Sequence, residues 1–553
     1  MYLAAYLGHG YLASSMEGIS VHIRRPARSA VSSARRAPSR GGSAFRRVSA
    51  RAVVPVAAVG GLAALSLATP AAGVSAVTAA VHKPSVRAVP DIGGPVLKTK
   101  QLPAPLTTTE CQAEIGINCY TPVQYRVAYD LNPLYAKGIT GAGRTIVIVD
   151  SYGSPTIAHD LHVFDQQFGF PDPTLVIDKF GNVPAFDPNN ATEVGWAEET
   201  SLDVEYAHSI APGAKIVLAE TPVAETEGVT GFPEMMNAEE SLINSGVGDV
   251  ISQSFGATEN TFPGFSSGNY SSLLDLRYAF KDAAAHSVTV LAASGDEGAT
   301  NDEADGETLY PYRVNSWPAS DPLVTAVGGT QLSLDNAGNR LSPDVVWNDG
   351  FGAGGGGVSA IFSRPLYQIG VSKVVGAKRG TPDISMSAAV NGGAWVYMSF
   401  AGIETPGVSD PGWYIFGGTS EATPIFSGVV ALADQYAHHR LGLINPALYT
   451  LGALSRVGVP NTGIVDVTSG NNTFGGVTGY DATPGYDLAS GWGTVDAAKF
   501  VPALARTGGL RKSCGGVEGA TAWPQVQPLA DQWLLPPRFG RPSTYPESAS
   551  MGP

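Results

Sequence analysis

Short apolar runs rich in β-branched residues alternate with longer segments of helical character across the middle of the chain. Runs that are apolar at every position are typical of strands buried on both faces. The alternation therefore predicts an α/β fold, a parallel sheet with helices on both sides. Ligands of such sheets bind at the carboxyl ends of the strands. We expect strands at 144–150, 215–219, 249–252 and 288–292, and helices at 193–210, 233–245 and 270–286.

A further apolar run, 425–432, follows the segment Gly417-Gly418-Thr419-Ser420 and predicts a buried helix. Ser420 then lies in the first turn of this helix, beside backbone N–H groups without intrahelical acceptors and at the positive end of the helix dipole. This position suits a nucleophile whose reaction develops negative charge. An N-cap serine is the alternative, so the interpretation requires a base and an oxyanion-stabilising group elsewhere in the chain.

Two carboxylates in the predicted helix 193–210 are candidates for the base. Glu199 and Asp203 are four residues apart, so their side chains lie on one face, one turn from each other. The apolar neighbours Trp196 and Leu202 favour partial burial, in which such a pair shares a proton and one pKa rises. A solvated acidic face is the alternative interpretation.

Asp296 is the candidate for the oxyanion-stabilising group, because it follows the predicted strand 288–292 and so lies at a strand's carboxyl end. It is either a turn residue or a carboxylic acid that its surroundings keep protonated. In the second case it donates a hydrogen bond to a developing oxyanion.

The two ends of the chain differ from this pattern. Residues 1–90 contain 11 of the 34 Lys and Arg but one of the 48 Asp and Glu. A basic region, an apolar run at about 53–68 and a zone of small residues follow in the order of a signal peptide, so we expect a secreted protein; an uncleaved membrane anchor is the alternative. Residues 506–553, rich in Pro, Gly and Ser, predict a disordered tail.

The charge balance bears on partners and surroundings. The part of the chain after residue 90 has a net charge of −24. This charge excludes a nucleic-acid-binding role. It is compatible with activity in an environment of low pH. Cys111 and Cys119 are eight residues apart, and export makes a disulfide between them the expected state, with Cys514 unpaired. Two free thiols are the alternative.

The segment from Gly417 to Gly428 resembles the nucleophile motif Gly-Thr-Ser-x-x-x-Pro of subtilisins and sedolisins. A subtilisin would also have a His-Gly-Thr motif, and none of the nine histidines is followed by Gly-Thr. The Glu199-x-x-x-Asp203 pair, and Asp296 in place of the oxyanion asparagine of subtilisins, resemble the sedolisin, or serine-carboxyl peptidase, family. Other matching stretches are 120–129, 211–216, 317–330, 354–359 and 382–385.

The resemblance implies a subtilisin-like parallel β-sheet flanked by helices in a single large catalytic domain, residues 120–505, preceded by a short linker or pro-segment at 91–119. It implies a secreted, acid-active endopeptidase for protein and peptide substrates, acting as a monomer and reaching a membrane only if the N-terminal apolar segment stays uncleaved. Ser420 would form the acyl-enzyme, Glu199 would take its proton, Asp203 would orient Glu199 and Asp296 would donate to the oxyanion.

The resemblance also implies one structural Ca²⁺, for which oxygen ligands are suited. Without the resemblance, the residues concerned would be interpreted as Asx-turns that bind no metal. The implied ligands are the side chains of Asp466 and Asp487 and the carbonyls of Val467, Thr483 and Gly485.

The chain departs from the family pattern in three respects. The stretch between the small-residue zone and Cys111 is too short for the long folded prodomain that the family usually carries. Phe255, which has no hydrogen-bond donor, stands near a position where many members have Trp, and Thr483 replaces a frequent Gly. The alternatives are an inactive sedolisin-like surface or binding protein, tripeptidyl-peptidase cleavage, a subtilisin-type enzyme using His208 or His286, and a carbohydrate-active enzyme using the acid pair.

Overall fold

The computed structural model describes residues 96–97, 104–403, 406–409 and 411–509. The predicted signal peptide, Cys514 and the predicted tail after residue 509 lie outside the described residues. Among the helices of the described ranges, none combines the length and apolar character that a membrane-spanning segment needs.

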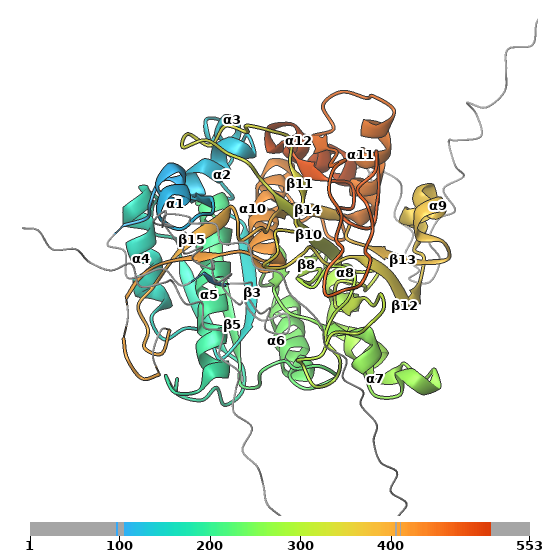
Figure 1. Ribbon diagram of the computed structural model, residues 1–553, viewed down its shortest axis with the longest axis horizontal. Coiled ribbons are helices and arrows are strands. Elements are labelled where there is room, and N and C mark those ends of the chain that lie inside the picture. Colours follow the sequence, from blue (N-terminus) through green and yellow to red (C-terminus); the bar gives the residue numbers. More distant parts are fainter. Residues whose placement is uncertain (1–95, 98–103, 404–405, 410, 510–553) are drawn as a thin grey trace, which may run out of the picture. The chain divides into compact units, whose positions relative to one another are not determined.

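An eight-stranded sheet occupies the centre of the fold (Figure 1). All neighbouring strands are parallel except β11, which runs antiparallel to β10. This confirms the predicted α/β class. In spatial order the strands are β11 (Val345–Val346), β10 (Thr325–Gln331), β8 (Thr289–Ala293), β6 (Val250–Gln253), β3 (Thr145–Ser151), β5 (Lys215–Thr221) and β4 (Leu175–Lys179), with β14 (Ile384–Ser387) also paired to β10.

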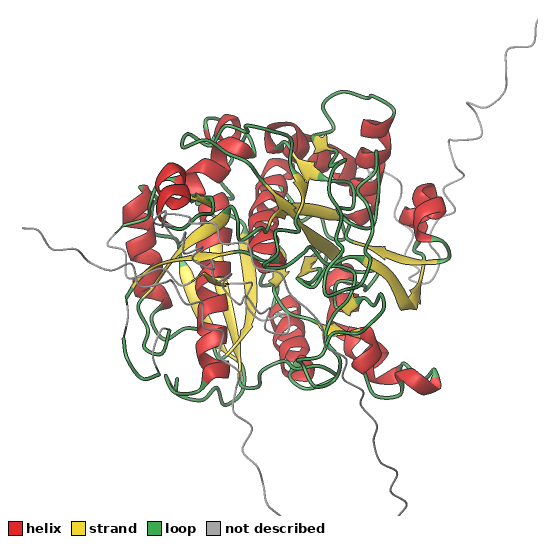
Figure 2. Ribbon diagram, viewed as in Figure 1, coloured by secondary structure: helices red, strands yellow, loops and turns green. Residues whose placement is uncertain are grey.

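Helices cover both faces of this sheet (Figure 2). Helices α5 and α10 pack together on one face, while α6 and α8 lie on the other. The α-helices are α1 (Thr108–Glu114), α2 (Pro122–Ala128), α3 (Asn132–Tyr135), α4 (Ile157–Phe168), α5 (Ala191–Ile210), α6 (Phe232–Asn244), α7 (Ser271–Leu274), α8 (Tyr278–Ala285), α9 (Ser372–Val375), α10 (Thr419–Ala437), α11 (Asn445–Arg456) and α12 (Ala497–Gly509).

Strand β3 shows why the central runs are apolar at every position. Ile146 and Ile148 belong to the hydrophobic cluster that contains residues of α5 and α10, whereas Val147 and Val149 belong to the cluster with α6 and α8. Successive residues of a strand point to opposite faces, so each face needs its own apolar set. The continuous apolar pattern therefore follows from burial on both sides.

A smaller, four-stranded sheet leads into α10. Its order is β1–β16–β15–β2, with β15 and β16 antiparallel and β2 parallel to β15. The remaining short strands pair in twos. The strands are β1 (Val96–Leu97), β2 (Cys119–Tyr120), β15 (Gly393–Met398) and β16 (Gly412–Phe416), and, outside this sheet, β7 (Ala257–Thr258), β9 (Ser316–Trp317), β12 (Gly357–Ser363), β13 (Lys378–Thr381), β17 (Ile464–Val465) and β18 (Thr494–Val495).

Cys111 of α1 and Cys119 of β2 form a disulfide, as expected, and both are fully buried. The stretch 104–119, expected to be part of a linker, thus contains a helix and a strand that pack on the core. At the other end α12 continues to Gly509, across the expected boundary at 505. The boundaries of the catalytic domain stay predictions.

The predicted helix 270–286 is divided into three pieces. Between α7 and α8, residues Asp275–Arg277 form a 3₁₀ turn. The guanidinium of Arg277 donates to both carboxylate oxygens of Asp321, a fully buried residue. Arg277 is the last residue of the 3₁₀ turn. Its contact with Asp321 is long-range, so the local pattern of apolar residues does not predict it.

Candidate active site

Ser420 is the second residue of α10, as predicted. The chain turns sharply into this helix from β16 through two glycines. Gly418 has a φ of 115°, and a Cβ added to Gly417 would lie 2.7 Å from the carbonyl oxygen of Ala388. The N–H of Ser420 is one of the first four of the helix, which lack intrahelical acceptors. Ser420 itself is buried, with 3% of its surface exposed.

Glu199 and Asp203 lie one turn apart on α5, and neither has exposed surface. Their burial is complete, beyond the partial burial that the sequence predicted. Helix α5 packs against α10, and this approach depends on Gly428 of α10. A Cβ added there would lie 2.6 Å from Cβ of Ile210 on α5. The glycine that ends the nucleophile motif thus sets how closely the helix of the acids approaches the helix of the serine.

Ser254 connects the two helices from the end of β6. Its Oγ donates to Oδ1 of Asp203 at 2.9 Å and lies 3.5 Å from the carbonyl oxygen of Ser420. The prediction did not include Ser254. Ser254 follows the predicted strand 249–252 and so lies at the carboxyl end of a strand. This position is the feature from which the sequence could have identified Ser254 as a site residue.

The electrostatics of Glu199 are set by burial. Burial and, after it, the nearby Asp150 raise the pKa of Glu199 well above its usual range, while the hydroxyls of Ser420 and Ser254 act in the opposite direction. Within the described residues, neither oxygen of Glu199 has a partner with full hydrogen-bond geometry. Hydrogen bonds of a catalytic base are often long or poorly aligned in the free protein and shorten when substrate binds. The geometry around Glu199 agrees with this behaviour.

Asp203 is perturbed in the same way. Burial, followed by the neighbouring Glu199, raises the pKa of Asp203 well above its usual range, and its hydrogen bond from Ser254 opposes the rise. Two carboxyls so close in a buried site share protons, as the sequence analysis anticipated for this pair.

Asp296 lies three residues after β8 and is turned towards the start of α10. Thr419 donates to its Oδ1 from the backbone N at 2.7 Å and from Oγ1 at 2.8 Å, and the N–H of Gly295 donates to the same hydroxyl at 3.1 Å. Burial raises the pKa of Asp296 to about 6, against the lowering effect of both Thr419 bonds. Oδ2 is left as the oxygen that can carry a proton.

A glycine-rich stretch supports the backbone of Asp296. The N–H of Gly355 donates to the carbonyl of Gly295 at 2.6 Å, and the N–H of Ala353 donates to the carbonyl of Asp296 at 2.8 Å. A Cβ at Gly355 would lie 2.0 Å from the carbonyl oxygen of Ser294. Only glycine allows this approach, which explains one of the four consecutive glycines Gly354–Gly357.

Asp150, at the carboxyl end of β3, is a further acid of the site that the sequence analysis missed. It is fully buried, and its charge raises the pKa of both Glu199 and Asp203. Burial raises the pKa of Asp150 itself to about 7, with Thr200 opposing and Glu220 adding to the rise. The signal was available, because Asp150 ends a predicted parallel strand and such ends lie along one edge of the sheet.

The residues named in the alternatives are engaged elsewhere. Nε2 of His208 lies 3.1 Å from Oδ1 of the buried Asp165, and Nδ1 of His286 lies 2.9 Å from the carbonyl oxygen of Asp282. Neither arrangement directs an imidazole at Ser420. Phe255 is fully buried in the cluster with Phe232, so it packs near the site without contributing a donor.

Four of the five expected calcium ligands, Asp466, Thr483, Gly485 and Asp487, lie at one turn. The N–H of Gly485 donates to Oδ2 of Asp466, and the N–H of Thr483 donates to Oδ2 of Asp487, each at 2.8 Å, so two carboxylates flank the turn 483–485. Across the described residues, no hydrogen bond is recorded to the carbonyls of Val467, Thr483 or Gly485, and no cluster of three or more His, Cys, Asp and Glu forms a metal site. Oδ1 of Asp487 accepts from the N–H groups of Ala489 and Ser490, as in the Asx-turn that the residues alone indicate. Two carboxylates and the carbonyls of this turn are oxygen groups of the kind that a hard cation binds.

Comparison with known proteins defines the class. A model described as the subtilase family matches residues 186–447, a range that includes the three acids Glu199, Asp203 and Asp296 and also Ser420. The fold and the position of the serine at the start of α10 thus belong to a subtilisin-like protein.

Curated relatives narrow this class. Kumamolisin from Bacillus sp. (strain MN-32) is 33% identical over 402 residues, 70% of this chain and 63% of the relative. Sedolisin from Pseudomonas sp. (strain 101) is 32% identical over 393 residues, which are 69% of this chain and 60% of the relative. Tripeptidyl-peptidase 1 of Mus musculus is 29% identical over 451 residues, which are 75% of this chain and 68% of the relative. The chain spans less than two thirds of the length of the first two.

A solved structure of Pseudomonas sedolisin, described as a serine-carboxyl proteinase complexed with two molecules of pseudo-iodotyrostatin, covers 71% of this chain and 99% of its own, with a TM-score of 0.57 and 29% identity. These matches support the sedolisin, or serine-carboxyl peptidase, family and a subtilisin-like fold for this chain. The predictions of family and fold are confirmed. The relatives are peptidases, in agreement with the predicted enzyme class.

Proposed function

We propose that this protein is an acid-active serine-carboxyl peptidase that cleaves peptide bonds through an acyl-enzyme on Ser420. The observation that carries the proposal is the burial of Glu199 and Asp203 on one helix against the helix of Ser420, with the Ser420 hydroxyl acting on the pKa of Glu199. A hydroxyl that interacts with a buried carboxylate has its proton acceptor beside it.

In the first half-reaction Ser420 Oγ forms a bond to the carbonyl carbon of the substrate, and its proton passes to Glu199. The carbonyl oxygen becomes an oxyanion that accepts a hydrogen bond from protonated Asp296 and one from the first-turn N–H of Ser420. The C–N bond then breaks as Glu199 returns the proton to the leaving amine. A water molecule repeats the sequence on the ester, which releases the acid and restores the serine.

The three acids Asp150, Glu199 and Asp203 form one buried cluster, so they cannot all be ionised together. The mechanism needs the single negative charge to reside on Glu199. The hydroxyl of Ser420 favours the ionised form of Glu199, whereas the proton of Ser254 is donated to Asp203. In the proposed mechanism Ser420 therefore selects Glu199 as the acid that carries the charge. Asp203 then holds a proton and orients Glu199.

The pH range follows from the same groups. Asp296 must be protonated to donate to the oxyanion, and burial raises the pKa of Asp296 to about 6. Activity therefore falls as pH rises through this value. Maximal activity at neutral or alkaline pH would contradict the carboxylate mechanism.

We also propose one structural Ca²⁺. Asp466 and Asp487 would hold it by side chain, and Val467, Thr483 and Gly485 by carbonyl. A bound cation would balance the two carboxylates and tie the turn 483–485 to them, which adds stability in proportion to its binding. The available carbonyls around this turn support the assignment.

Substrates, location and assembly are proposals of the same kind. We expect protein and peptide substrates, no nucleic acid partner, a monomer, and export directed by the N-terminal segment. An inactive sedolisin-like binding protein is disfavoured because Glu199, Asp203, Asp296 and Ser420 are all present at one site. A carbohydrate-active enzyme would leave the serine beside Glu199 without a role.

The test compares the mature protein with Ser420→Ala, Glu199→Gln and Asp296→Asn on a peptide library at acid pH. Loss of about 10³-fold or more in kcat/KM in Ser420→Ala and Glu199→Gln would support the assignment. Peptides with acetylated N-termini separate the two modes of cleavage, because a tripeptidyl-peptidase requires a free amino terminus. Equal cleavage by wild type and Ser420→Ala would overturn the proposal.

A further inference from the structure

Three consecutive residues at the start of α10 are held by three different parts of the fold. Thr419 donates to Asp296, the carbonyl of Ser420 lies 3.5 Å from Oγ of Ser254, and Oε1 of Glu421 accepts a hydrogen bond of 2.7 Å from the hydroxyl of Tyr125. The first two contacts belong to the site already described. The third comes from α2, and the mechanism above does not use it.

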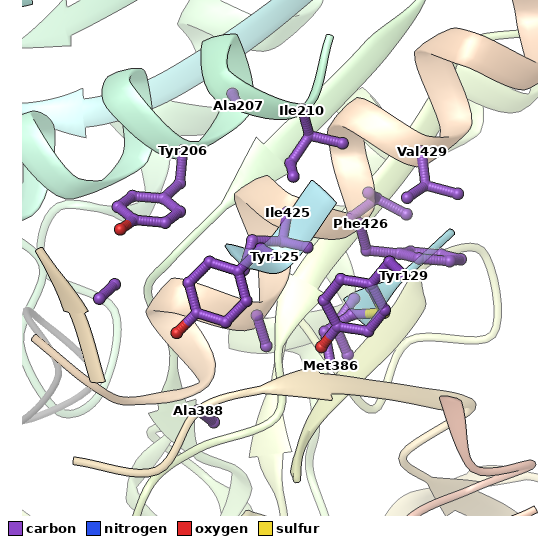
Figure 3. Close-up of a cluster of buried hydrophobic side chains, with 14 of the residues drawn as sticks. Tyr125, Tyr129, Tyr206, Ala207, Ile210, Met386, Ala388, Ile425, Phe426 and Val429 are labelled. Carbon is purple, nitrogen blue, oxygen red and sulfur yellow. The ribbon is translucent and has the colours of Figure 1, made fainter. Parts of the chain in front are cut away.

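Glu421 follows the nucleophile directly and has no exposed surface. Its Oε2 has no hydrogen-bond partner within the described residues. Figure 3 shows the rings of Tyr125, Tyr129 and Tyr206 gathered beside the first turns of α10, close to Ile425 and Phe426. The surroundings of Glu421 are thus aromatic and apolar, apart from the hydroxyls of Tyr125 and Ser387.

The titratable groups that face Glu421 are phenols and one acid. They are Tyr120 of β2, Tyr125 and Tyr129 at α2, Tyr206 of α5, and Asp296 after β8. No cation among the described residues faces it. An ionised Glu421 would therefore be a buried charge without a counter-charge, which folded proteins avoid.

The number of protons available for hydrogen bonds around Tyr125 also favours a neutral Glu421. The single hydroxyl proton of Tyr125 has two acceptors, Oε1 of Glu421 at 2.7 Å and the carbonyl oxygen of Gly392 at 3.0 Å. If Glu421 is protonated, it donates to Tyr125 and Tyr125 donates to Gly392, so both contacts are hydrogen bonds. Ser387 donates its own hydroxyl proton to the oxygen of Tyr125 at 3.3 Å. If Glu421 is ionised, Tyr125 can serve one of its two acceptors, and the other lacks a donor unless Ser387 gives up its bond to Tyr125.

We propose that Glu421 is a positioning residue that works in its protonated form, donating to Tyr125 and thereby fixing the peptide that carries Ser420. The nucleophile is then held from two sides, by Ser254 next to the acid pair and by Glu421 next to α2. The turn at Gly392, which opens β15, is joined to the same network through Tyr125. This inference rests on the proposed peptidase function.

The acid range suits this role. Burial raises the pKa of Glu421 to about 8, with Tyr125 and Ser387 opposing the rise. Glu421 therefore remains neutral throughout the range in which Asp296 can act as a donor. Its proton is a fixed part of the site at working pH, unlike the protons of the acid cluster, which must move.

The kinetic test uses Glu421→Gln, Glu421→Met and Tyr125→Phe. The methionine and phenylalanine variants remove the hydrogen bond, and we expect kcat to fall about tenfold, the kinetic equivalent of one buried hydrogen bond, with KM little changed. Glutamine keeps a donor for Tyr125 and is expected to restore most of kcat. An equal loss in Glu421→Gln and Glu421→Met would overturn the donor role.

The pH profile gives a readout that a purely structural role would not move. If Glu421 is neutral, the alkaline limb of kcat/KM in Glu421→Gln coincides with that of wild type. If Glu421 is ionised at working pH, its removal lets Asp296 ionise more easily and the limb moves to lower pH. That shift would contradict the proposal.

Asp434 provides the control within the same helix. It is a fully buried carboxyl 14 residues after Ser420, about 20 Å along the helix axis. Asp434→Asn is expected to change stability without changing kcat. A tenfold loss of kcat in this variant as well would mean that any buried substitution in α10 disturbs the site, and would overturn the specific role of Glu421.

A second measurement separates this inference from the peptidase function. In a Ser420→Ala background, which needs no catalysis, Glu421→Gln should raise the unfolding temperature at pH 9 and leave it unchanged at pH 4, below the ordinary value of 4.5 for the pKa of a glutamate. An equal difference in unfolding temperature at both pH values would show that folding does not raise the pKa of Glu421, and would contradict a neutral Glu421 at working pH. If the parent enzyme proves inactive, this stability experiment still decides the protonation state.

Discussion

Thr419 donates two hydrogen bonds to one oxygen of Asp296, from its backbone N at 2.7 Å and from its hydroxyl at 2.8 Å. Both bonds favour the ionised carboxylate and hold Oδ1 in place. In Thr419→Val the hydroxyl bond is lost, so the pKa of Asp296 rises above about 6. We expect the alkaline limb of kcat/KM to move upward by about one pH unit.

Thr423→Val is the matched control for this experiment. Thr423 is another buried threonine of α10, and its hydroxyl donates to the carbonyl of Thr419 at 2.8 Å, away from Asp296. Its pH profile should match that of wild type. A Thr419→Val profile without any shift would mean that Asp296 does not govern the alkaline limb.

Asp150 gives the second prediction. The mechanism assigns the single charge of the buried cluster to Glu199, and burial raises the pKa of Asp150 to about 7, so Asp150 is protonated in the acid working range. Asp150→Asn therefore removes no charge in that range, and the acid limb of kcat/KM should match that of wild type. A shift of the acid limb to lower pH would show that Asp150 is ionised beside Glu199.

The catalytic candidates were predictable because each has a local signature. Ser420 follows a glycine pair at a helix start, Glu199 and Asp203 have helical spacing, and Asp296 ends a strand. The structure brings all four to one region. Tyr125 carries no such signature: its hydroxyl meets Glu421 across 296 residues of sequence, and only the packing of α2 on α10 creates the contact.

Some strands of the main sheet also lack a sequence pattern from which they could have been predicted. Strand β10 contains two adjacent glycines, and β14, Ile384–Ser387, has serine at alternate positions. Glycine and serine weaken the β-branched signal on which strand prediction depends. At Gly329 a Cβ would lie 2.8 Å from the side chain of Trp347, so packing at this position selects glycine over the residues typical of strands.

The contact between α5 and α10 predicts opposite effects for two glycines. Gly428→Ala forces Cβ against Ile210, so it should lower the free energy of unfolding by about 1–3 kcal/mol and displace Ser420 from Glu199. Gly195→Ala, on α5, meets no atom within 4 Å and should stabilise the helix by about 0.5–1 kcal/mol. Urea unfolding and kcat measure both. Equal stability of the two variants would contradict the close approach.

Calcium removal forms the fourth prediction. A chelator should lower the unfolding temperature of wild type, and added Ca²⁺ should restore it. In Asp487→Asn the response to chelator should disappear. Asp305→Asn is a suitable control, since Asp305 is exposed and caps its own turn through Thr308. A wild-type unfolding temperature that does not depend on the chelator would remove the calcium proposal.

Stability itself should decrease towards alkaline pH. Burial raises the pKa of Asp150 to about 7 and that of Glu239 to about 8 in the folded protein, above their ordinary values of 3.8 and 4.5. Groups with a raised folded pKa contribute full stability below the unfolded value, and this contribution is lost as pH rises through the folded value, at about 1.4 kcal/mol per pKa unit.

Thermal unfolding of Ser420→Ala between pH 3 and 9 measures this dependence without self-cleavage. Glu239→Gln should flatten the decline above pH 6, since glutamine has no proton to lose. Gln253, whose amide donates to Glu239, keeps a hydrogen-bond acceptor in this variant. Greater stability at pH 8 than at pH 4 would contradict the raised pKa values.

The residues around Ser420 come from segments that are far apart in the chain: β3 supplies Asp150, α5 supplies Glu199 and Asp203, the end of β8 supplies Asp296, and α10 supplies the serine. None of these segments holds more than two of them. During synthesis the nucleophile emerges last, and it meets its base only when α5 and α10 have closed on each other. Hydrolytic capacity therefore arises as a product of completed folding, and a partly folded chain has no means of cutting its neighbours.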